Sequence, residues 1–328
     1  MSSQAIFTQG AAPATPGAGL STLYVKADTK LYLKNDSGTE FGPLGASSAI
    51  DNSINDFRLT LTTAVPVTTA DVTGATTIFC CPYKGMNIAL YDGANWNQRS
   101  STQFSIALGT LTSSLPYDVF CFDNSTVPTL EILAWSNSTA RATALVYQDG
   151  VLVKSGVTTR RYMGTFFTTS TTQTEDSVAN RYLYNYSNRV ARVMQRFEST
   201  ASWNYTLATL RQANASTSNQ INFIQGVAED AVTARVLGVF TNTSACTAQV
   251  GIGLDSTTTN TAAVFMGTGS SSFAVGVMAD YIGTPAIGKH FLAWLESSVA
   301  TGTTTFYGNG TLAAGAVAKS GIQGSMQG

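Results

Sequence analysis

Charged residues are scarce in this sequence. Lys, Arg, Asp and Glu make up 11% of the 328 residues, less than half of the roughly one quarter that is usual in globular proteins. The 18 basic and 19 acidic residues leave a net charge of −1. A chain with this balance has no broad electrostatic attraction to nucleic acid or to an anionic membrane surface, so we expect neither as a partner.

Histidine and cysteine, which build many metal sites, are also rare. The single histidine is His290, and this number excludes any site that needs two or three histidines. The four cysteines, at Cys80, Cys81, Cys121 and Cys246, match neither a zinc-ligand spacing nor a disulfide framework. We therefore expect free thiols, synthesis in a reducing cytoplasm, and neither a metal nor a cofactor.

Features of secretion and of membrane insertion are missing as well. No Lys or Arg precedes Lys26, and the N-terminus has no apolar segment of the kind found in signal peptides. The uncharged runs 236–254 and 256–279 are as long as a membrane span, but Thr, Ser, Asn and Gln interrupt both. We expect short strands there and no membrane insertion. The polar, charge-poor coat is typical of an extracellular protein, yet nothing directs the chain to secretion.

The N-terminal region, residues 1–48, contains an arm and a small sheet. The first twenty residues are mainly Ala, Gly, Ser, Thr and Pro, which predicts an arm that orders against a partner. Residues 23–26, 31–34 and 39–41 alternate as strands and are separated by turn sequences, which predicts a three-stranded β-meander. Three strands bury little apolar surface, so we expect a partner chain to cover the sheet.

Residues 49–160 are expected to form a first β domain. Short strand-like runs recur about every ten residues between turn sequences, which favours an antiparallel sandwich or barrel. The clearest signal is Asp149-Gly150 between residues 145–147 and 151–153, because Asp-Gly is a preferred two-residue hairpin turn.

Residues 161–328 are expected to form a C-terminal, jelly-roll-like β-sandwich. Residues 176–196 fit both a helical and a strand periodicity, and the sequence leaves that choice open. Arginines cluster where the two β domains meet. The candidates for an interdomain or intersubunit contact are Arg160, Arg161, Arg181, Arg189 and Arg192.

No catalytic residue is expected, and we predict that the chain is not an enzyme. A Ser-His-Asp site would need His290, but the sequence contains no Gly-x-Ser-x-Gly motif. The adjacent acids at 175–176 and 229–230 would point to opposite faces of a strand, which makes each a poor catalytic pair. Calcium at residues 35–37 or 51–56 stays open, although neither stretch has the acidic density of an EF-hand.

Aromatic residues offer one binding hypothesis. Trp96 and Trp203 sit among Asn and Ser residues, and Tyr205 follows Trp203 closely. An exposed ring beside amides or hydroxyls is suited to stacking on a sugar. Core packing is the commoner fate of such rings, and Trp96, Trp203 and Tyr205 are the candidate glycan contacts.

Several stretches resemble structural proteins of tailed-phage virions, of the tail-fibre or head-decoration type. They are TPGAG at 15–19, LYVK at 23–26, LYLKNDSGTE at 31–40, PYKG at 82–85, IALYDG at 88–93, LPYDV at 115–119, YQDGVLVKSG at 147–156 and RRY at 160–162. The resemblance covers roughly the first two thirds of the chain and carries no catalytic motif.

The resemblance implies a virion protein, expected to be a homotrimeric fibre or spike. Its N-terminal arm would dock on other virion proteins, and its C-terminal domain would face outward and contact a host surface glycan. Synthesis in host cytoplasm and release by lysis would explain an extracellular coat without a signal peptide. The alternatives are a capsid decoration protein and a glycan-binding or glycan-depolymerising fibre protein.

Overall fold

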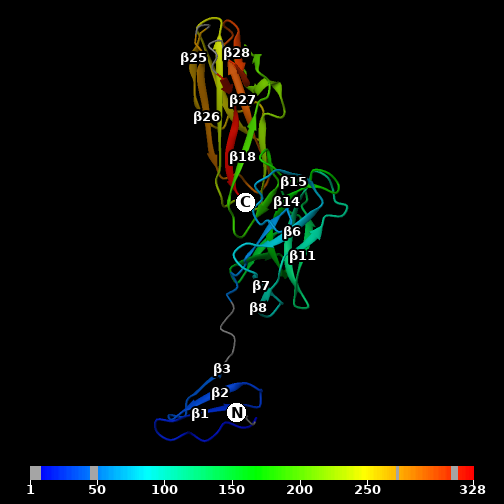
Figure 1. Ribbon diagram of the computed structural model, residues 1–328, viewed down its shortest axis with the longest axis vertical. Coiled ribbons are helices and arrows are strands. Elements are labelled where there is room, and N and C mark those ends of the chain that lie inside the picture. Colours follow the sequence, from blue (N-terminus) through cyan, green and yellow to red (C-terminus); the bar gives the residue numbers. More distant parts are fainter. Residues whose placement is uncertain (1–8, 45–50, 271–272, 312–316) are drawn as a thin grey trace. The chain divides into compact units, whose positions relative to one another are not determined.

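The computed structural model describes residues 9–44, 51–270, 273–311 and 317–328 (Figure 1). The chain divides into two compact units, residues 1–51 and residues 52–328. The predicted mostly β architecture is confirmed, because the strands form several largely antiparallel sheets. The helical structure among the described residues is a single 3-10 turn, η1 (Ala213–Ala215). None of the helices in those residues is long and apolar enough to cross a membrane.

Residues 1–51 contain the expected three-stranded meander. Its strands are β1 (Ser21–Val25), β2 (Leu31–Asn35) and β3 (Glu40–Leu44), paired antiparallel in the order β1-β2-β3. The turn between β2 and β3 depends on Asn35, whose side-chain oxygen accepts a hydrogen bond from the Thr39 backbone, and on Gly38, whose φ is +82°. Such local turn chemistry fixes the strand register without a large core.

The first part of residues 52–328 packs a small sheet against a larger one. The small sheet has the order β4-β6-β9, and a separate hairpin is formed by β7 and β8. These strands are β4 (Phe57–Thr60), β6 (Thr77–Pro82), β7 (Asn87–Tyr91), β8 (Trp96–Ser100) and β9 (Phe104–Ala107). The larger sheet has the order β11-β10-β14-β13-β12, with β17 added beside β14. Its strands are β10 (Pro116–Asn124), β11 (Val127–Ala134), β12 (Leu145–Gln148), β13 (Val151–Lys154), β14 (Val157–Phe167) and β17 (Leu183–Asn185).

The Asp-Gly hairpin is confirmed. Gln148 pairs with Val151, so Asp149 and Gly150 form a two-residue loop, with φ values of +50° and +84°. A type I′ turn requires positive φ at both positions, which Asp tolerates and Gly adopts freely.

The C-terminal part is a sandwich of two sheets whose long strands run beside one another in Figure 1. One sheet has the order β25-β23-β27-β21-β16-β15-β5, with β20 beside β27. Its strands are β5 (Val72–Ala75), β15 (Thr174–Asp176), β16 (Asn180–Arg181), β20 (Arg211–Gln212), β21 (Gln220–Gln225), β23 (Cys246–Leu254), β25 (Gly267–Gly269) and β27 (Gly288–Ser298).

The other sheet has the order β18-β31-β22-β26-β24, with β28 beside β22 and β19 beside β28. Its strands are β18 (Ala191–Phe197), β19 (Ser202–Asn204), β22 (Val232–Asn242), β24 (Ala263–Phe265), β26 (Val275–Gly283), β28 (Thr304–Tyr307) and β31 (Gly321–Gln327). A small hairpin joins β29 (Asn309–Thr311) to β30 (Val317–Lys319). The ambiguous residues 176–196 contain strands and no helix, because β16, β17 and β18 each pair with a neighbour and the residues between them are not helical.

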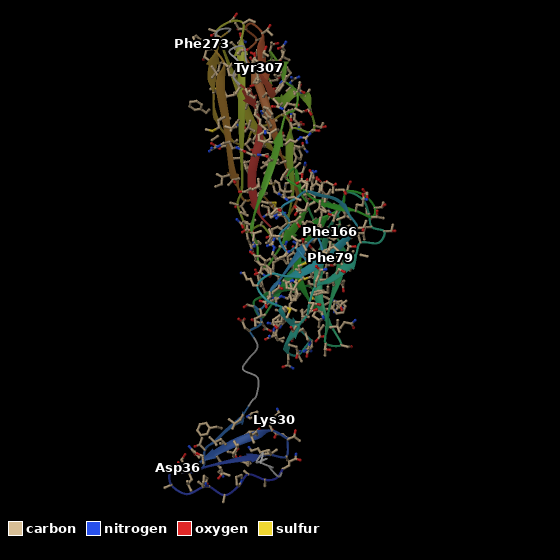
Figure 2. All side chains as sticks on the ribbon, viewed as in Figure 1. Lys30, Asp36, Phe79, Phe166, Phe273 and Tyr307 are labelled. Carbon is tan, nitrogen blue, oxygen red and sulfur yellow. The ribbon has the colours of Figure 1, made fainter. Side chains whose placement is uncertain are left out.

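Residues on both sides of position 160 share one strand, one sheet and one core. β14 runs from Val157 to Phe167, and β5 pairs with β15 in the sheet that also contains β21 and β27. Phe120 and Leu152 belong to the same buried cluster as Trp294. Figure 2 shows Phe166 within the first β region and Tyr307 at the opposite end of the sandwich. A separation into domains at residue 160 stays a prediction.

Candidate functional site

Arg161 holds the first residues of the larger unit against β14. Its guanidinium is buried, with the residue 5% exposed, and it donates hydrogen bonds to the carbonyl oxygens of Asn52, Ser53, Ile54 and Ala89. A planar guanidinium with five N–H groups can satisfy several carbonyls at once. This arginine therefore joins two segments of the chain about a hundred residues apart in sequence.

Two further candidate arginines share one buried carboxylate. Arg181 Nη1 lies 2.9 Å from Asp176 Oδ1, and Arg192 Nη2 lies 2.6 Å from Asp176 Oδ2. Arg181 also donates to the Val193 carbonyl, and Arg192 donates to the Thr68 carbonyl. Thr68 and Arg192 come from the two expected β domains, and an interdomain role for these arginines stays a prediction.

Arg160 lies on β14, the central strand of the larger first sheet. Its Nε donates to Glu131 Oε2 at 2.7 Å, and its guanidinium lies 3.8 Å from the centre of the Phe122 ring. Lys154 donates to the other oxygen of the same carboxylate. Arg189, the fifth candidate, donates from Nη2 to Glu229 Oε2 at 2.9 Å. Each candidate arginine thus has partners within the chain, and an intersubunit role stays a prediction.

Trp203 lies in the core, so its ring is not exposed as a glycan contact would require. It is 9% exposed, its Nε1 donates to Glu296 at 2.7 Å, and its ring stacks on Phe306. β19 pairs with β28, and Trp203, the middle residue of β19, lies opposite the buried Phe306 on the inner face of the sandwich. Tyr205 is partly buried and stacks with Arg211, whose guanidinium carbon lies 3.8 Å from the ring centre.

Trp96 is partly exposed at the start of β8. Its ring centre lies 5.4 Å from that of Tyr91, and its Nε1 donates to Asp149 Oδ2 at 2.9 Å. β8 and β28, the partner of β19, lie at opposite ends of residues 52–328 in Figure 1. The structure therefore does not bring Trp96 together with Trp203 and Tyr205.

His290 has both ring nitrogens engaged. Nδ1 lies 2.7 Å from Asp255 Oδ2, and Nε2 lies 2.9 Å from the carbonyl oxygen of Ala286. Burial favours a raised pKa for Asp255, but the hydrogen bond with His290 and the one from the Phe291 backbone lower it. In a hydrolytic triad Nε2 would face a nucleophilic hydroxyl. Here it faces a backbone carbonyl.

Two carboxylates that the sequence did not single out lie close together inside the sandwich. The Asn214 backbone donates to Glu296, and the Asn214 side chain donates to Glu198. Glu296 also accepts hydrogen bonds from Trp203 and Arg211, and burial raises its pKa. Paired acids are what glycan hydrolysis needs. These two are 0% and 6% exposed, so they anchor loops and do not face a substrate.

Two aspartates of the calcium candidates accept hydrogen bonds from backbone groups far away in the sequence. Asp36 Oδ2 accepts a hydrogen bond from the Gly19 backbone, and Asp56 Oδ2 accepts one from the Asn87 backbone. Among the described residues, no group of three or more His, Cys, Asp or Glu side chains is arranged to hold a metal ion. The four cysteines are free and buried, and burial raises the pKa of Cys121 to about 12.

A cleft of about 400 Å³ lies beside the Asp-Gly hairpin. Its lining comes from β12, β13, the loop after β21 and the loop before β27, and it includes Leu145, Tyr147, Leu152, Val227, Glu229 and Ile287. Tyr147 and Glu229 were not grouped by sequence, because about eighty positions separate them. The signal that the sequence offered was a tyrosine, Tyr147, next to the Asp-Gly hairpin turn.

Comparison with known proteins gives little further information. No protein family and no curated relative matches the chain. Two solved insecticidal toxins of Bacillus thuringiensis show weak structural similarity. The functional form of the mosquito-larvicidal Cry4Aa toxin is 10% identical, with a TM-score of 0.21, over 78% of this chain and 51% of that one. The delta-endotoxin Cry8Ea1 is 8% identical, with a TM-score of 0.21, over 83% and 51%. The chain spans about half the length of either toxin, and similarity this low carries no argument.

Proposed function

We propose that this chain is a non-enzymatic structural protein of a tailed-phage virion. It attaches to the particle through residues 1–51, assembles as a homotrimer and presents its C-terminal sandwich outward. The resemblance of its N-terminal and middle segments to phage structural proteins supports this proposal.

The N-terminal meander carries the proposal. Among its described hydrophobic side chains, Tyr24 is the one that is buried, whereas Leu20, Leu23, Phe41 and Leu44 are 63%, 37%, 48% and 40% exposed. A three-stranded sheet of this size gains little stability from its own burial. Contact with another virion protein would cover these side chains, which supports attachment as the role of this unit.

The outer face of the sheet β18-β31-β22-β26-β24 supports self-association. Along β22, Leu237 points outward while its neighbour Val236 is buried. Apolar side chains from four strands are exposed on this face, namely Val193 at 58%, Leu237 at 42%, Phe265 at 66% and Ile282 at 76%. The solvent face of an antiparallel sheet is normally polar, and an apolar patch there indicates a protein interface.

A second copy of the chain is the occupant that the charges favour. Arg235 and Asp280 pair across β22 and β26, with Nε and Oδ1 2.6 Å apart, and both side chains are about half exposed. They lie in a groove of about 510 Å³ that Val193 and Ile282 also line. One cation beside one anion leaves this face without net charge, so a neighbouring copy meets apolar surface around the pair and no net-charge repulsion.

Cryo-electron microscopy of virus particles that carry the chain tests the attachment. Wild-type chain should appear at the head, collar or tail, and this position separates a decoration protein from a fibre. A variant with Leu23→Ser and Phe41→Ser should be missing from the particle, because both exposed contacts become polar. Particles that lack the wild-type chain, although the producing cells contain it, would refute the proposal.

A further inference from the structure

The cleft beside the Asp-Gly hairpin combines an apolar floor with an exposed ring. Tyr147 and Leu152 are directly paired across β12 and β13, so both lie on the same face of the hairpin as Leu145. Leu152 and Val227 are buried and belong to the core, whereas Tyr147 is 64% exposed. A rigid apolar floor with a projecting tyrosine ring is therefore already formed in the free chain.

A carboxylate stands at the rim of this cleft. Glu229 Oε2 accepts a hydrogen bond from Arg189 Nη2 at 2.9 Å, and its side chain is 41% exposed. Within the described part of the chain, Oε1 of Glu229 has no hydrogen-bond partner. Arg189 also pairs with Asp230, which keeps Arg189 and Glu229 in place. The free oxygen can accept a hydrogen bond from a ligand hydroxyl or amide.

A second tyrosine adjoins this rim. Burial, the charge of Glu229 and the neighbouring Tyr147 together raise the pKa of Tyr186 to about 12. Its hydroxyl is already hydrogen-bonded to Tyr147, and this contact helps to hold the Tyr147 ring at the rim. Arg141, which also lines the cleft, is committed to Asp118, where both oxygens of the carboxylate accept its N–H groups.

We propose that this cleft binds a neutral sugar residue that carries a methyl group, either an acetamido sugar or a 6-deoxy sugar. The Tyr147 ring would stack on the apolar face of the pyranose, Glu229 Oε1 would accept a hydroxyl or amide N–H, and the methyl group would lie on the floor of Leu145, Leu152 and Val227. Sites for small ligands have volumes of about 300–1,000 Å³, with apolar walls and few polar groups. The cleft fits that description.

The paired charges at the rim are the reason for a neutral ligand. Arg189 is already bound by Glu229 and Asp230, and Arg141 by Asp118, so no unpaired cation in the described part of the cleft attracts an anionic ligand. The proposal goes beyond the virion role and does not depend on it.

Saturation-transfer NMR on the full chain tests the proposal with three probes, N-acetyl-D-glucosamine, L-rhamnose and D-glucose. In N-acetyl-D-glucosamine, in L-rhamnose or in both, the methyl protons should receive the strongest saturation. The probe that binds shows whether the ligand is an acetamido sugar or a 6-deoxy sugar. D-glucose should bind at least about fivefold more weakly, because it cannot fill the apolar floor. Equal binding of all three probes, or binding of none, would overturn the assignment.

Variants locate the binding. Tyr147→Ala should weaken the affinity about tenfold, which corresponds to about 1.4 kcal/mol, and Glu229→Gln should weaken it less. Tyr83→Ala is the matched control, because Tyr83 is 40% exposed and does not line the cleft. Tyr147 is largely exposed, so its variant should keep the thermal unfolding midpoint of the wild type. Unchanged affinity in Tyr147→Ala would refute the site.

Discussion

Residues 1–51 and residues 52–328 form strands with the same turn chemistry, but they differ in what those strands bury. In the smaller unit, Tyr24 is the buried hydrophobic side chain among the described residues. The larger unit buries two clusters that include Trp294, Tyr162 and Phe166, each at most 1% exposed. Local hydrogen bonds therefore define a fold in both units, while a core supports only one of them.

This difference suggests that the two units have different roles. The larger unit has the buried area that an independent domain needs. The smaller unit keeps its apolar side chains on the surface, where an assembly partner can cover them. The sheet that contains β22 shows the same feature within the larger unit. Its inner face packs the core, whereas its outer face carries exposed apolar side chains.

Truncation of the core should give the largest effect. Trp294→Ala removes a ring that is 1% exposed and contacts Trp203 edge to face. The loss should be about 3–5 kcal/mol of unfolding free energy, because a large cavity remains. Urea denaturation measures it. Val127→Ala, at a side chain that is 59% exposed, is the control and should change the free energy by less than about 0.5 kcal/mol.

Removal of the shared carboxylate should have the next largest effect. Asp176→Asn leaves Arg181 and Arg192 buried with an uncompensated charge, and the expected loss is about 3 kcal/mol. The control is Glu131→Gln, at a partly exposed carboxylate, where the loss should be about 1 kcal/mol or less. Equal losses in the two variants, measured by urea denaturation, would contradict the importance of the buried arrangement.

Substitutions in the smaller unit should leave the unfolding free energy of the larger unit unchanged. All four tryptophans lie beyond residue 51, so their fluorescence reports unfolding of the larger unit alone. Leu23→Ser combined with Phe41→Ser should shift its unfolding free energy by less than about 0.5 kcal/mol, since both side chains are exposed. A shift above about 1 kcal/mol would mean that the two units depend on each other for stability.

The smallest effect is expected in the pH dependence of stability. Burial opposes ionisation of Glu131, but hydrogen bonds from Lys154 and Arg160 outweigh it and lower the pKa below the ordinary 4.5. Its folded pKa is thus below its unfolded pKa, so this contribution is present above pH 4.5 and is lost as the pH falls through the folded value. The difference in urea midpoint between wild type and Glu131→Gln should therefore be larger at pH 7 than at pH 3. A constant difference would show that ionisation is not its source.

Local sequence patterns predicted the parts of the fold that depend on neighbouring residues. The meander follows from alternation and from turns such as that at Asn35 and Gly38, and the hairpin follows from Asp149-Gly150. Turn residues fix the register of adjacent strands, so these features need no information about distant contacts.

Features that depend on contacts between distant segments could not be predicted from local sequence patterns. Trp203 faces inward because β19 pairs with β28, about a hundred residues later. Tyr147 and Glu229 share a cleft only because the hairpin packs near the loop after β21. Residues 176–196 satisfied both helical and strand periodicity, and their strand neighbours decided the outcome.

The central claim is that the chain forms a homotrimer through the outer face of the sheet that contains β22. The mass of the protein in solution tests this claim most directly. Light scattering at micromolar concentration should give three times the 34.5 kDa of one chain. Phe265→Glu combined with Ile282→Glu should reduce the mass to that of one chain, because charges replace the exposed apolar side chains of the outer sheet face. A wild-type mass of 34.5 kDa would contradict the account.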